Sequence, residues 1–364
     1  MALRASGIRR LAGVACVLAL AAGAPAVAQR GAAKPEPIPS ALEAMADAER
    51  EFAHRATVVG WKEAFLEYLS ESAIGYDGEE VGLAKEQIRA NPDPPKGHQL
   101  LWEPRYGDVA RSGELGYLTG PSRNILPSRN NGQPRHGVYA SVWKRERDGT
   151  FRVVVDVGVT TPRAASFAEG FTRAPAANRF TGDLSDRTPP LGVAESVLNS
   201  DLRTSAVQAY RGRLAPGVRF HRPLAMPVLG EAAVLRFLAT QPRYDQADSR
   251  FAESAQSGDL GYTWGTWSRR LPPARGRAGA PASAPPVVPQ GQAGTARQGQ
   301  STTARQGQST TAPQGQGNTA PQGQGNTARQ GPRGGAARVQ SGFYTRVWVR
   351  DRSGQWKVVL DVLN

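Results

Sequence analysis

The sequence predicts an α+β protein built from two copies of one unit, each with helices first and an antiparallel sheet after them. The stretch Ser112-Gly-Glu-Leu-Gly-Tyr117 returns as Ser257-Gly-Asp-Leu-Gly-Tyr262, and Tyr139-Ala-Ser-Val-Trp143 returns as Tyr344-Thr-Arg-Val-Trp348. After each pair comes a glycine turn and then a valine-rich run that holds one aspartate. Self-similarity of this kind indicates a duplicated unit, and 364 residues suffice for two cores.

The first copy begins with helical signals. Ser40 and Glu43 have the spacing of a capping box, in which each side chain satisfies a free backbone N–H of the other residue. Apolar side chains recur at helical spacing up to Ala56, and Glu49 is the one polar break on that face. A helix is therefore predicted from Ser40 to about Gly60. The elements predicted after it are a helix over 61–69, a short strand over 73–76 and a short helix over 84–90.

A β-meander is predicted in each copy, because β-branched and aromatic runs alternate with glycine turns, most clearly at Asp148-Gly149. The strands predicted for the first copy are 100–106, 108–111, 115–120, 137–147 and 150–159. The elements predicted for the second are helices over 194–203, 205–214 and 231–238, and strands over 218–221, 260–268, 342–350 and 355–363, in a meander that begins near 250. Residues 161–190 are predicted to be a linker.

The second copy carries an insert at 271–338. The paired motifs stand 145 residues apart before it and 205 after it, so about 60 additional residues lie in a loop between two strands. Ala-Arg-Gln-Gly-Gln-Ser-Thr-Thr occurs from residue 296 and again from residue 304. With almost nothing apolar to bury, the insert is predicted to be disordered. Its spaced arginines suit weak binding to an anionic envelope polymer; the alternative is a repeat with no role beyond solubility.

The N-terminus has the order of a cleavable secretory signal peptide. Arg4, Arg9 and Arg10 precede an apolar run, and a small-x-small cleavage signal ends at Ala28. This predicts a signal peptide over 1–28, a spacer over 29–39, domains over 40–160 and 191–364, a periplasmic or secreted bacterial protein, and no membrane span after processing. Cys16 is the only cysteine and lies inside the leader, so the processed chain has no disulfide. A lipoprotein would need Cys16 as its acylated first residue.

The net charge of +14 is concentrated in two segments. Three arginines lie in the leader, and nine lie between Ser268 and Gln340, where there is no Asp or Glu, so the remaining chain is close to neutral. Aromatic residues do not alternate with the arginines of the insert, as stacking on nucleotide bases requires. A nucleic-acid partner is therefore not expected.

The order of elements resembles the nuclear transport factor 2-like fold, also called cystatin-like α+β. Gly60-Trp-Lys-Glu-Ala-Phe65, Trp102-x-Pro104, Gly113-Glu-Leu-Gly-Tyr117-x-x-Gly120 and the ending Trp143…Asp148-Gly149…Val153-Val-Val-Asp156 are similar to the SnoaL-like bacterial branch near ketosteroid isomerase. The resemblance covers 40–159, and from Ser257 onward in the second copy outside the insert. It implies two tandem cones, in each of which a curved antiparallel sheet surrounds helices and leaves an apolar pocket at its wide end. It does not imply one activity, because this fold hosts enzymes, binding proteins and assembly modules.

Two residues are candidates for acid/base chemistry. Asp156 lies in a valine-rich strand, where burial would raise its pKa; the alternative is a structural hydrogen bond, since Asp361 occupies the same place in the second copy. His136 is a candidate at the pocket mouth, although a lone histidine is more often a rim residue. The four histidines show no metal-ligand spacing, so no metal or cofactor is expected.

The remaining candidates are aromatic or polar residues expected to furnish the two cones, although most aromatic residues of this kind are simply core. Those of the first pocket are Trp61, Phe65, Tyr76, Trp102, Tyr117, Tyr139 and Trp143. Those of the second are Tyr210, His221, Tyr262, Trp264, Tyr344, Trp348 and Asp361.

The sequence favours an exported pocket protein that binds a small, largely apolar ligand or serves as an interaction module. The alternatives are an isomerase, dehydratase or cyclase that uses an Asp or His as general acid/base, and an envelope interaction protein that uses the insert. A homodimer or a pseudo-dimer within one chain is compatible with the tandem arrangement.

Overall fold

The computed structural model describes residues 40–78, 80–175, 179–182, 189–271 and 338–364, and these form two sheets. The first sheet has the strand order β2-β1-β7-β6-β5-β4-β8, with β3 also paired to β5, and the second has the order β10-β9-β14-β13-β12-β11. Most neighbouring strands are antiparallel, but β1 pairs with β7, and β9 with β14, in parallel. The fold is therefore α+β with two tandem sheets, as predicted.

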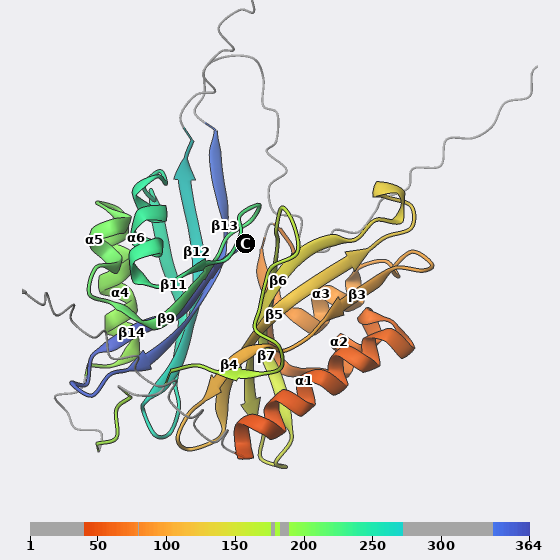
Figure 1. The fold of residues 1–364 in the computed structure, drawn as a ribbon, viewed down its shortest axis with the longest axis horizontal. Coiled ribbons are helices and arrows are strands. Elements are labelled where there is room, and N and C mark those ends of the chain that lie inside the picture. The colour runs from red at the N-terminus through yellow and green to blue at the C-terminus, as the bar shows by residue number, and fades with distance from the viewer. Residues whose placement is uncertain (1–39, 79, 176–178, 183–188, 272–337) are drawn as a thin grey trace, which may run out of the picture. The chain divides into compact units, whose positions relative to one another are not determined.

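The first half contains three helices and a short 3-10 turn. The helices are α1 (Ser40–Val59), α2 (Trp61–Tyr68) and α3 (Ala84–Ala90), and the turn is η1 (Asn130–Gly132). The strands are β1 (Leu69–Tyr76), β2 (Val81–Leu83), β3 (Gln99–Trp102), β4 (Tyr106–Val109), β5 (Leu115–Ile125), β6 (Arg135–Arg145), β7 (Phe151–Thr160) and β8 (Thr172–Arg173). Figure 1 shows the three helices gathered on one side of this sheet.

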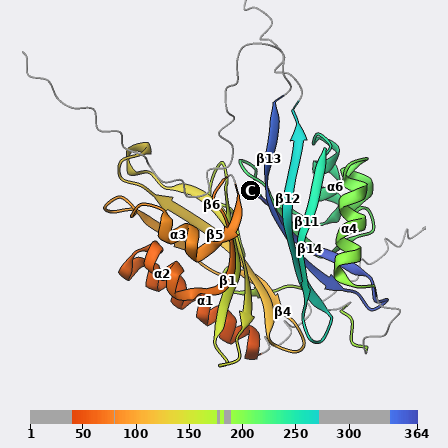
Figure 2. The same cartoon turned by 180° about the vertical axis from the view of Figure 1, so that it is seen from behind.

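The second half repeats this order. Its helices are α4 (Leu191–Leu202), α5 (Ala206–Tyr210) and α6 (Glu231–Ala239). Its strands are β9 (Leu214–His221), β10 (Val228–Leu229), β11 (Gln246–Ser254), β12 (Leu260–Arg270), β13 (Val339–Arg350) and β14 (Trp356–Leu363). The reverse view in Figure 2 shows α4 and α6 along one side of this sheet. None of the described helices combines the length and apolar character needed to cross a membrane.

Helix α1 forms because its apolar positions fall on one face. Leu42, Met45 and Phe52 are fully buried on that face, where they pack with Trp143 and Val153 of the sheet. Glu49 shares the buried face and is equally inaccessible to solvent. The predicted break in the apolar stripe is thus a carboxyl group inside the core.

Several boundaries differ from the predictions for local reasons. The strand predicted over 100–106 ends at Trp102 as β3, and the strand predicted over 108–111 is β4, which begins at Tyr106, so that Glu103–Arg105 lie between the two. Gly120 of β5 admits the backbone there, since a Cβ on Gly120 would fall 1.8 Å from the Glu103 carbonyl oxygen. Strands β1 and β9 each begin four residues earlier than predicted, because their ladders pass through an irregularity that breaks the alternation of apolar residues. Helix α5 is shorter than the predicted helix over 205–214, because β9 already begins at Leu214.

The insert joins β12 to β13. These strands pair from Leu260↔Val349 to Arg270↔Val339, and the Leu271 N–H donates to the Arg338 carbonyl oxygen at 2.8 Å. The insert is therefore carried by a hairpin, as predicted. Residues 272–337, on which the prediction of disorder rests, lie outside the described residues, as does the predicted signal peptide.

The two sheets share a core and a set of reciprocal contacts. Valines and leucines of both sheets belong to one buried cluster. At one end of it, the backbone N–H of Ser112 donates to Ser257 Oγ at 3.1 Å, and the backbone N–H of Ser257 donates to Ser112 Oγ at 3.1 Å. The N–H of Arg111 likewise donates to Asp259, and that of Gln256 to Glu114. Each contact has a counterpart with the roles exchanged, as at an isologous dimer interface.

The predicted linker takes part in this interface. Strand β8 pairs with β4, and Arg179 follows it as a buried side chain. One Arg179 nitrogen lies 2.5 Å from an Asp108 oxygen, and another lies 3.0 Å from an Asp259 oxygen. Because residues 40–364 belong to a single compact unit, the domain boundaries at 160 and 191 remain a prediction.

Candidate ligand pocket

A cavity of about 230 Å³ lies in the first half, lined by the sheet and by Phe65 of α2, and the C-terminal residue Asn364 also contributes to its lining. Its apolar wall is formed by Phe65, Tyr76, Leu100, Trp102 and Tyr139. Its polar lining is formed by Ser122, Asn124, Arg135, His136, Asp156, Thr160 and Asn364. A second cavity of about 140 Å³ shares Phe65, Tyr76 and Asp156 with the first and is also lined by Trp61. Apolar walls with a few converging polar groups are the usual composition of a small-molecule site.

The register of β6 and β7 places the polar groups of this pocket on one face of the sheet. Ser141 pairs with Asp156, and Tyr139 pairs with Gly158, so all four residues face the helices. Gly158 lines the cavity, and a Cβ there would meet only the Val138 carbonyl oxygen, at 3.8 Å. The lack of a side chain at Gly158 thus helps to leave the cavity open.

Glu49 of α1 forms hydrogen bonds with side chains on this face of the sheet. Its carboxyl accepts hydrogen bonds from the indole N–H groups of Trp102, at 2.6 Å, and Trp143, at 2.7 Å, and from the Ser141 hydroxyl. Burial raises the pKa of Glu49, and these three donors oppose that rise. Glu49 therefore fixes the orientation of Trp102, a wall of the pocket, and places a carboxyl near Asp156.

Asp156 is a polar group that lines both cavities. Its side chain is partly buried, and it makes no hydrogen bond or ion pair with another side chain in the described part of the protein. Burial, together with the nearby charge of Glu49, raises the pKa of Asp156 well above its usual value. A carboxyl with a raised pKa keeps its proton, so Asp156 can donate a hydrogen bond to a ligand oxygen or transfer a proton.

Tyr139 adds a second polar group. Its hydroxyl is buried and has no hydrogen-bond partner among the described residues. Burial and the charges of Glu49 and Asp156 raise the pKa of Tyr139 well above its usual value. Tyr139 therefore remains a neutral hydroxyl, which a ligand or a water molecule could satisfy.

His136 lines the pocket. His98 does not line it but forms hydrogen bonds with residues that do. The Trp61 indole donates to His98 Nδ1 at 3.2 Å, and His98 Nε2 lies 3.0 Å from Asn124 Oδ1. Burial lowers the pKa of His98. His98 thus holds Trp61 and Asn124, which line the two cavities, although no pattern in the sequence singles it out.

Five of the seven residues predicted for the first pocket line one or both cavities: Trp61, Phe65, Tyr76, Trp102 and Tyr139. Tyr117 does not, because alternation along β5 turns its ring into the core between the sheets. Trp143 does not either; it is fully buried under the pocket against Phe52. Glu49, Asn124 and Arg135 were missed, although the polar break in the α1 stripe pointed to Glu49.

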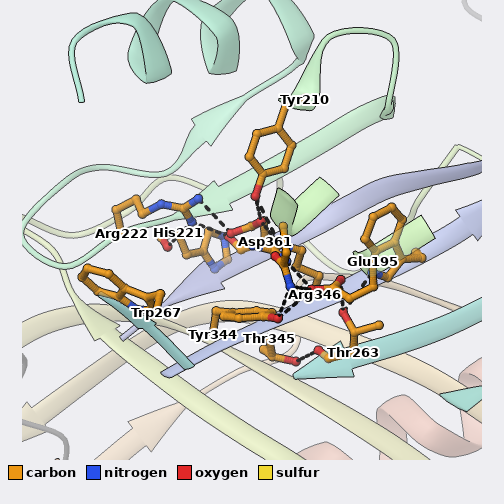
Figure 3. A network of polar contacts seen from close by, with 12 residues as sticks. Glu195, Tyr210, His221, Arg222, Thr263, Trp267, Tyr344, Thr345, Arg346 and Asp361 are labelled. Carbon is orange, nitrogen blue, oxygen red and sulfur yellow. Dashed lines mark hydrogen bonds and ion pairs between the residues drawn. The ribbon is translucent and has the colours of Figure 1, made fainter. Parts of the chain in front are cut away.

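The interior of the second half is filled by an ionic network (Figure 3). Asp361 lies 2.8 Å from Arg346 Nε and 2.8 Å from a terminal nitrogen of Arg222, and it accepts a hydrogen bond from the Tyr210 hydroxyl. Burial alone would raise the pKa of Asp361, but the two arginines and Tyr210 outweigh it and the pKa is lowered. Asp361 is thus a carboxylate held by partners, unlike Asp156.

Arg346 is the residue that distinguishes the two halves. By the spacing of the repeat it occupies the place of Ser141, and it lies between Asp361 and Glu195 (Figure 3). Tyr344 donates to Glu195 at 2.7 Å, and the Trp348 indole donates to Thr263 at 3.0 Å. The predicted second pocket is therefore absent from the described interior at this point, because a guanidinium and its partners occupy it.

The other residues predicted for that pocket also lie elsewhere. Tyr262 and Trp264 pack against the core between the sheets, where Tyr262 donates to Glu253 and Trp264 stacks near Phe251. His221 is fully buried, and burial with the charge of Arg219 lowers its pKa to about 3. No three His, Cys, Asp or Glu side chains are grouped to hold a metal ion within the described ranges.

No protein-family model matches the sequence, and no curated protein matches it. Solved structures are similar over about a third of the chain. A putative ketosteroid isomerase from Parabacteroides distasonis is 16% identical, with 31% of this chain and 83% of that chain covered and a TM-score of 0.25. The hub of CaMKII from S. rosetta is 13% identical, with 34% and 99% covered and a TM-score of 0.27. A protein from Novosphingobium aromaticivorans, described as NTF2-like with a cystatin-like fold, is 15% identical, with 32% and 80% covered and a TM-score of 0.26.

Proposed function

We propose that the protein is an exported tandem member of the nuclear transport factor 2-like superfamily, whose first half binds a small, largely apolar molecule through one oxygen atom. The observation that carries this proposal is Asp156, a carboxyl with a raised pKa that faces a cavity with aromatic walls and has no side-chain partner among the described residues. A partly buried carboxyl without a protein partner can hydrogen-bond to a ligand, and a ligand that covers this bond gains affinity from it.

The geometry defines the ligand class. The cavity is smaller than the roughly 300–1,000 Å³ usual for drug-sized ligands, so a molecule of one or two rings fits it better than a larger one. Protonated Asp156 donates a hydrogen bond, which favours a ketone or ether oxygen over a carboxylate. Trp102 and Phe65 supply flat apolar surface for the ring system.

A matched pair of probes tests the proposal. 2-Acetonaphthone and 2-ethylnaphthalene have nearly the same shape, but only the ketone has an acceptor oxygen. We expect the ketone to bind about tenfold more tightly at acidic pH, as one hydrogen bond to a buried group permits. Its binding should weaken as pH rises through the folded-state pKa of Asp156, because the carboxylate has no proton to donate. In Asp156→Asn the amide donates at every pH, so this pH dependence should vanish.

Gly158→Leu is the matched blocking variant. A Cβ at Gly158 would have only an ordinary contact of 3.8 Å with the Val138 carbonyl oxygen, and it projects on the face of β7 that lines the cavity. Both probes should therefore lose binding while the melting temperature stays close to that of the unmodified chain. Equal binding of ketone and hydrocarbon, or unchanged binding in Gly158→Leu, would contradict the proposal. Native mass spectrometry of the protein purified from its own host would then identify any resident molecule.

A second function, proton transfer at an enolisable carbonyl, is supported by the same carboxyl. Asp156 has the raised pKa of a general acid/base, and Tyr139 offers a neutral hydroxyl nearby. The ketone probe distinguishes the two functions, because an enzyme of this kind would accelerate deuterium exchange at its methyl group and Asp156→Asn would abolish the acceleration. Binding without exchange supports the pocket protein alone.

A further inference from the structure

A cavity of about 180 Å³ lies in the second half, beside the filled interior. The lining residues that matter here are Arg222, Phe237, Trp267, Arg269, Gln340 and Leu363. None of them belongs to the second pocket predicted from the sequence. They combine two guanidinium groups with three large apolar side chains.

The repeat shows that this cavity corresponds to the mouth of the first pocket. The spacing of the Tyr117/Tyr262 pair puts Arg269 at the place of Asn124, and the spacing of the Tyr139/Tyr344 pair puts Gln340 at the place of Arg135. In each half these two positions are ladder partners, Asn124↔Arg135 and Arg269↔Gln340. In the first half the amide lies on β5 and the arginine on β6, whereas in the second half the arginine lies on β12 and the amide on β13. Leu363 stands at the place of Gly158, so a leucine side chain lines the second cavity where the first has none.

The charges around this cavity do not balance. Arg222 and Arg346 are matched by Asp361 and Glu195 within the ionic network. Arg269 is not matched: among the described residues it makes no ion pair, and its one side-chain hydrogen bond runs from Nε to Gln340 Oε1 at 2.8 Å. One positive charge therefore remains at the cavity.

That charge is also poorly solvated. The Arg269 guanidinium lies 5.2 Å from the centre of the Trp267 ring and 5.9 Å from that of Tyr244, and its side chain is partly buried. Burial, with a smaller contribution from the charge of Arg222, lowers the pKa of Arg269. A partly buried guanidinium whose terminal nitrogens make no hydrogen bond with another described residue is a strong partner for a carboxylate, which it can bind through two parallel hydrogen bonds.

We propose that this cavity is a second binding site, selective for a small organic monoanion in which a carboxylate is attached to an apolar ring. Arg269 binds the carboxylate, and Phe237 and Leu363 contact the ring. The two halves of the chain thus hold sites of opposite chemistry, a hydrogen-bond donor for a neutral oxygen in the first and a cation for an anion in the second.

Benzoate and benzamide test the charge requirement on the unmodified full-length chain. They share a ring and a planar head group, but only benzoate is an anion, so calorimetric titration should show benzoate binding about tenfold more tightly, and more weakly at high salt. Inorganic phosphate, an anion without a ring, should bind more weakly than benzoate. Equal affinities for benzoate and benzamide, or no saturable benzoate binding up to about 10 mM, would overturn the proposal.

Neighbouring arginines provide the matched variants. Arg269→Gln should lower benzoate affinity about tenfold, whereas Arg270→Gln should leave it unchanged, because the Arg270 side chain is 72% exposed and lies on the other face of β12. Arg269→Lys, which keeps the charge, should restore part of the affinity, and melting temperatures report whether each variant folds. Gly158→Leu should not affect benzoate. Equal losses in the Arg269 and Arg270 variants, or loss in Gly158→Leu, would place the anion elsewhere and refute the assignment.

Discussion

At the scale of single residues, one aspartate has opposite surroundings in the two halves. Asp156 has no side-chain partner among the described residues and a raised pKa, whereas Asp361 has two arginines and a lowered pKa. At a pH between its unfolded-state and folded-state pKa values, Asp156 is protonated in the folded form and ionised in the unfolded chain. Between the corresponding pKa values of Asp361, that residue is ionised in the folded form and protonated in the unfolded chain. Stability must then depend on pH with opposite sign at the two sites.

This asymmetry predicts the effect of the same substitution in both halves. Stability falls as pH rises from the unfolded-state pKa of Asp156 to its raised folded-state pKa, because over that range the unfolded chain releases a proton that the folded chain keeps. Asp156→Asn removes this loss and should therefore be more stable than the unmodified chain at pH 7. Asp361 contributes stability above its unfolded-state pKa that is lost as pH falls through the lowered pKa. Asp361→Asn leaves Arg222 and Arg346 short of a partner and should cost about 3 kcal/mol at pH 7.

Urea unfolding at a series of pH values measures both effects, with each variant compared to the unmodified chain. If Asp156→Asn is destabilised at pH 7, the carboxylate has a structural role that the described contacts do not show. If Asp361→Asn is neutral, the network in the second half contributes no net stability.

The sequence could identify the residues of the first pocket by type, but not all by position. Tyr117 and Tyr139 are both aromatic residues of predicted strands, and only the register decides that Tyr139 faces the helices and Tyr117 the other sheet. The ionic network that fills the second interior was not predicted. The sequence shows that Arg346 is charged but not which residues pair with it, because Glu195 and Asp361 are 151 and 15 residues away along the chain.

At the scale of elements, helices and strands with strong local signals were predicted closely. Helices α1 and α3 match their predictions because an apolar stripe defines the first, and the prolines after residue 90 end the second. The starts of β1 and β9 were missed because their irregular pairing with β7 and β14 is a tertiary effect. Strand β8 has only two residues, too few for a periodic signal.

The hairpin that carries the insert allows a prediction at this scale. Strands β12 and β13 remain paired up to Arg270↔Val339, so replacing 272–337 by Asn-Gly should close the same ladder with a two-residue turn. The melting temperature should change by less than about 2 °C, by differential scanning calorimetry. A fall of more than about 5 °C would show that the insert contributes to the folded state.

The same deletion tests the proposal that the insert binds an anionic polymer. Retention on an anionic polymer column should be lost in the deletion and should fall with salt in the full chain, because its arginines act as screened charges. Equal retention of the two proteins would exclude binding of the anionic polymer by the insert.

At the scale of the whole described molecule, Arg179 joins the two halves. It lies between Asp108 of the first sheet and Asp259 of the second, and it is 7% exposed. Arg179→Met removes the cation and leaves both carboxyls buried, which should cost about 3 kcal/mol in urea unfolding. Arg111→Met is the control, because Arg111 also contacts the linker but is exposed, so it should cost less than about 0.5 kcal/mol.

A mutant cycle separates the contribution of the Arg179 ion pairs to stability from the contribution of its packing. Adding Asp259→Asn to Arg179→Met should recover part of the loss, because Arg179 is the one ion-pair partner of Asp259 among the described residues, whereas Asp108 keeps Arg173 at 3.0 Å. Additive losses would mean that Arg179 acts through packing alone.

The reciprocal bonds between Ser112 and Ser257 have a consequence for how the two halves can differ. In a dimer of identical chains, every substitution appears in both subunits, so a guanidinium that closes one cavity also closes the other. Here one continuous chain supplies both sides of the interface, and a change such as serine to arginine at the place of Ser141 and Arg346 occurs once. Covalent linkage thus allows the two halves to carry different interior side chains and different cavities, which two identical subunits cannot do.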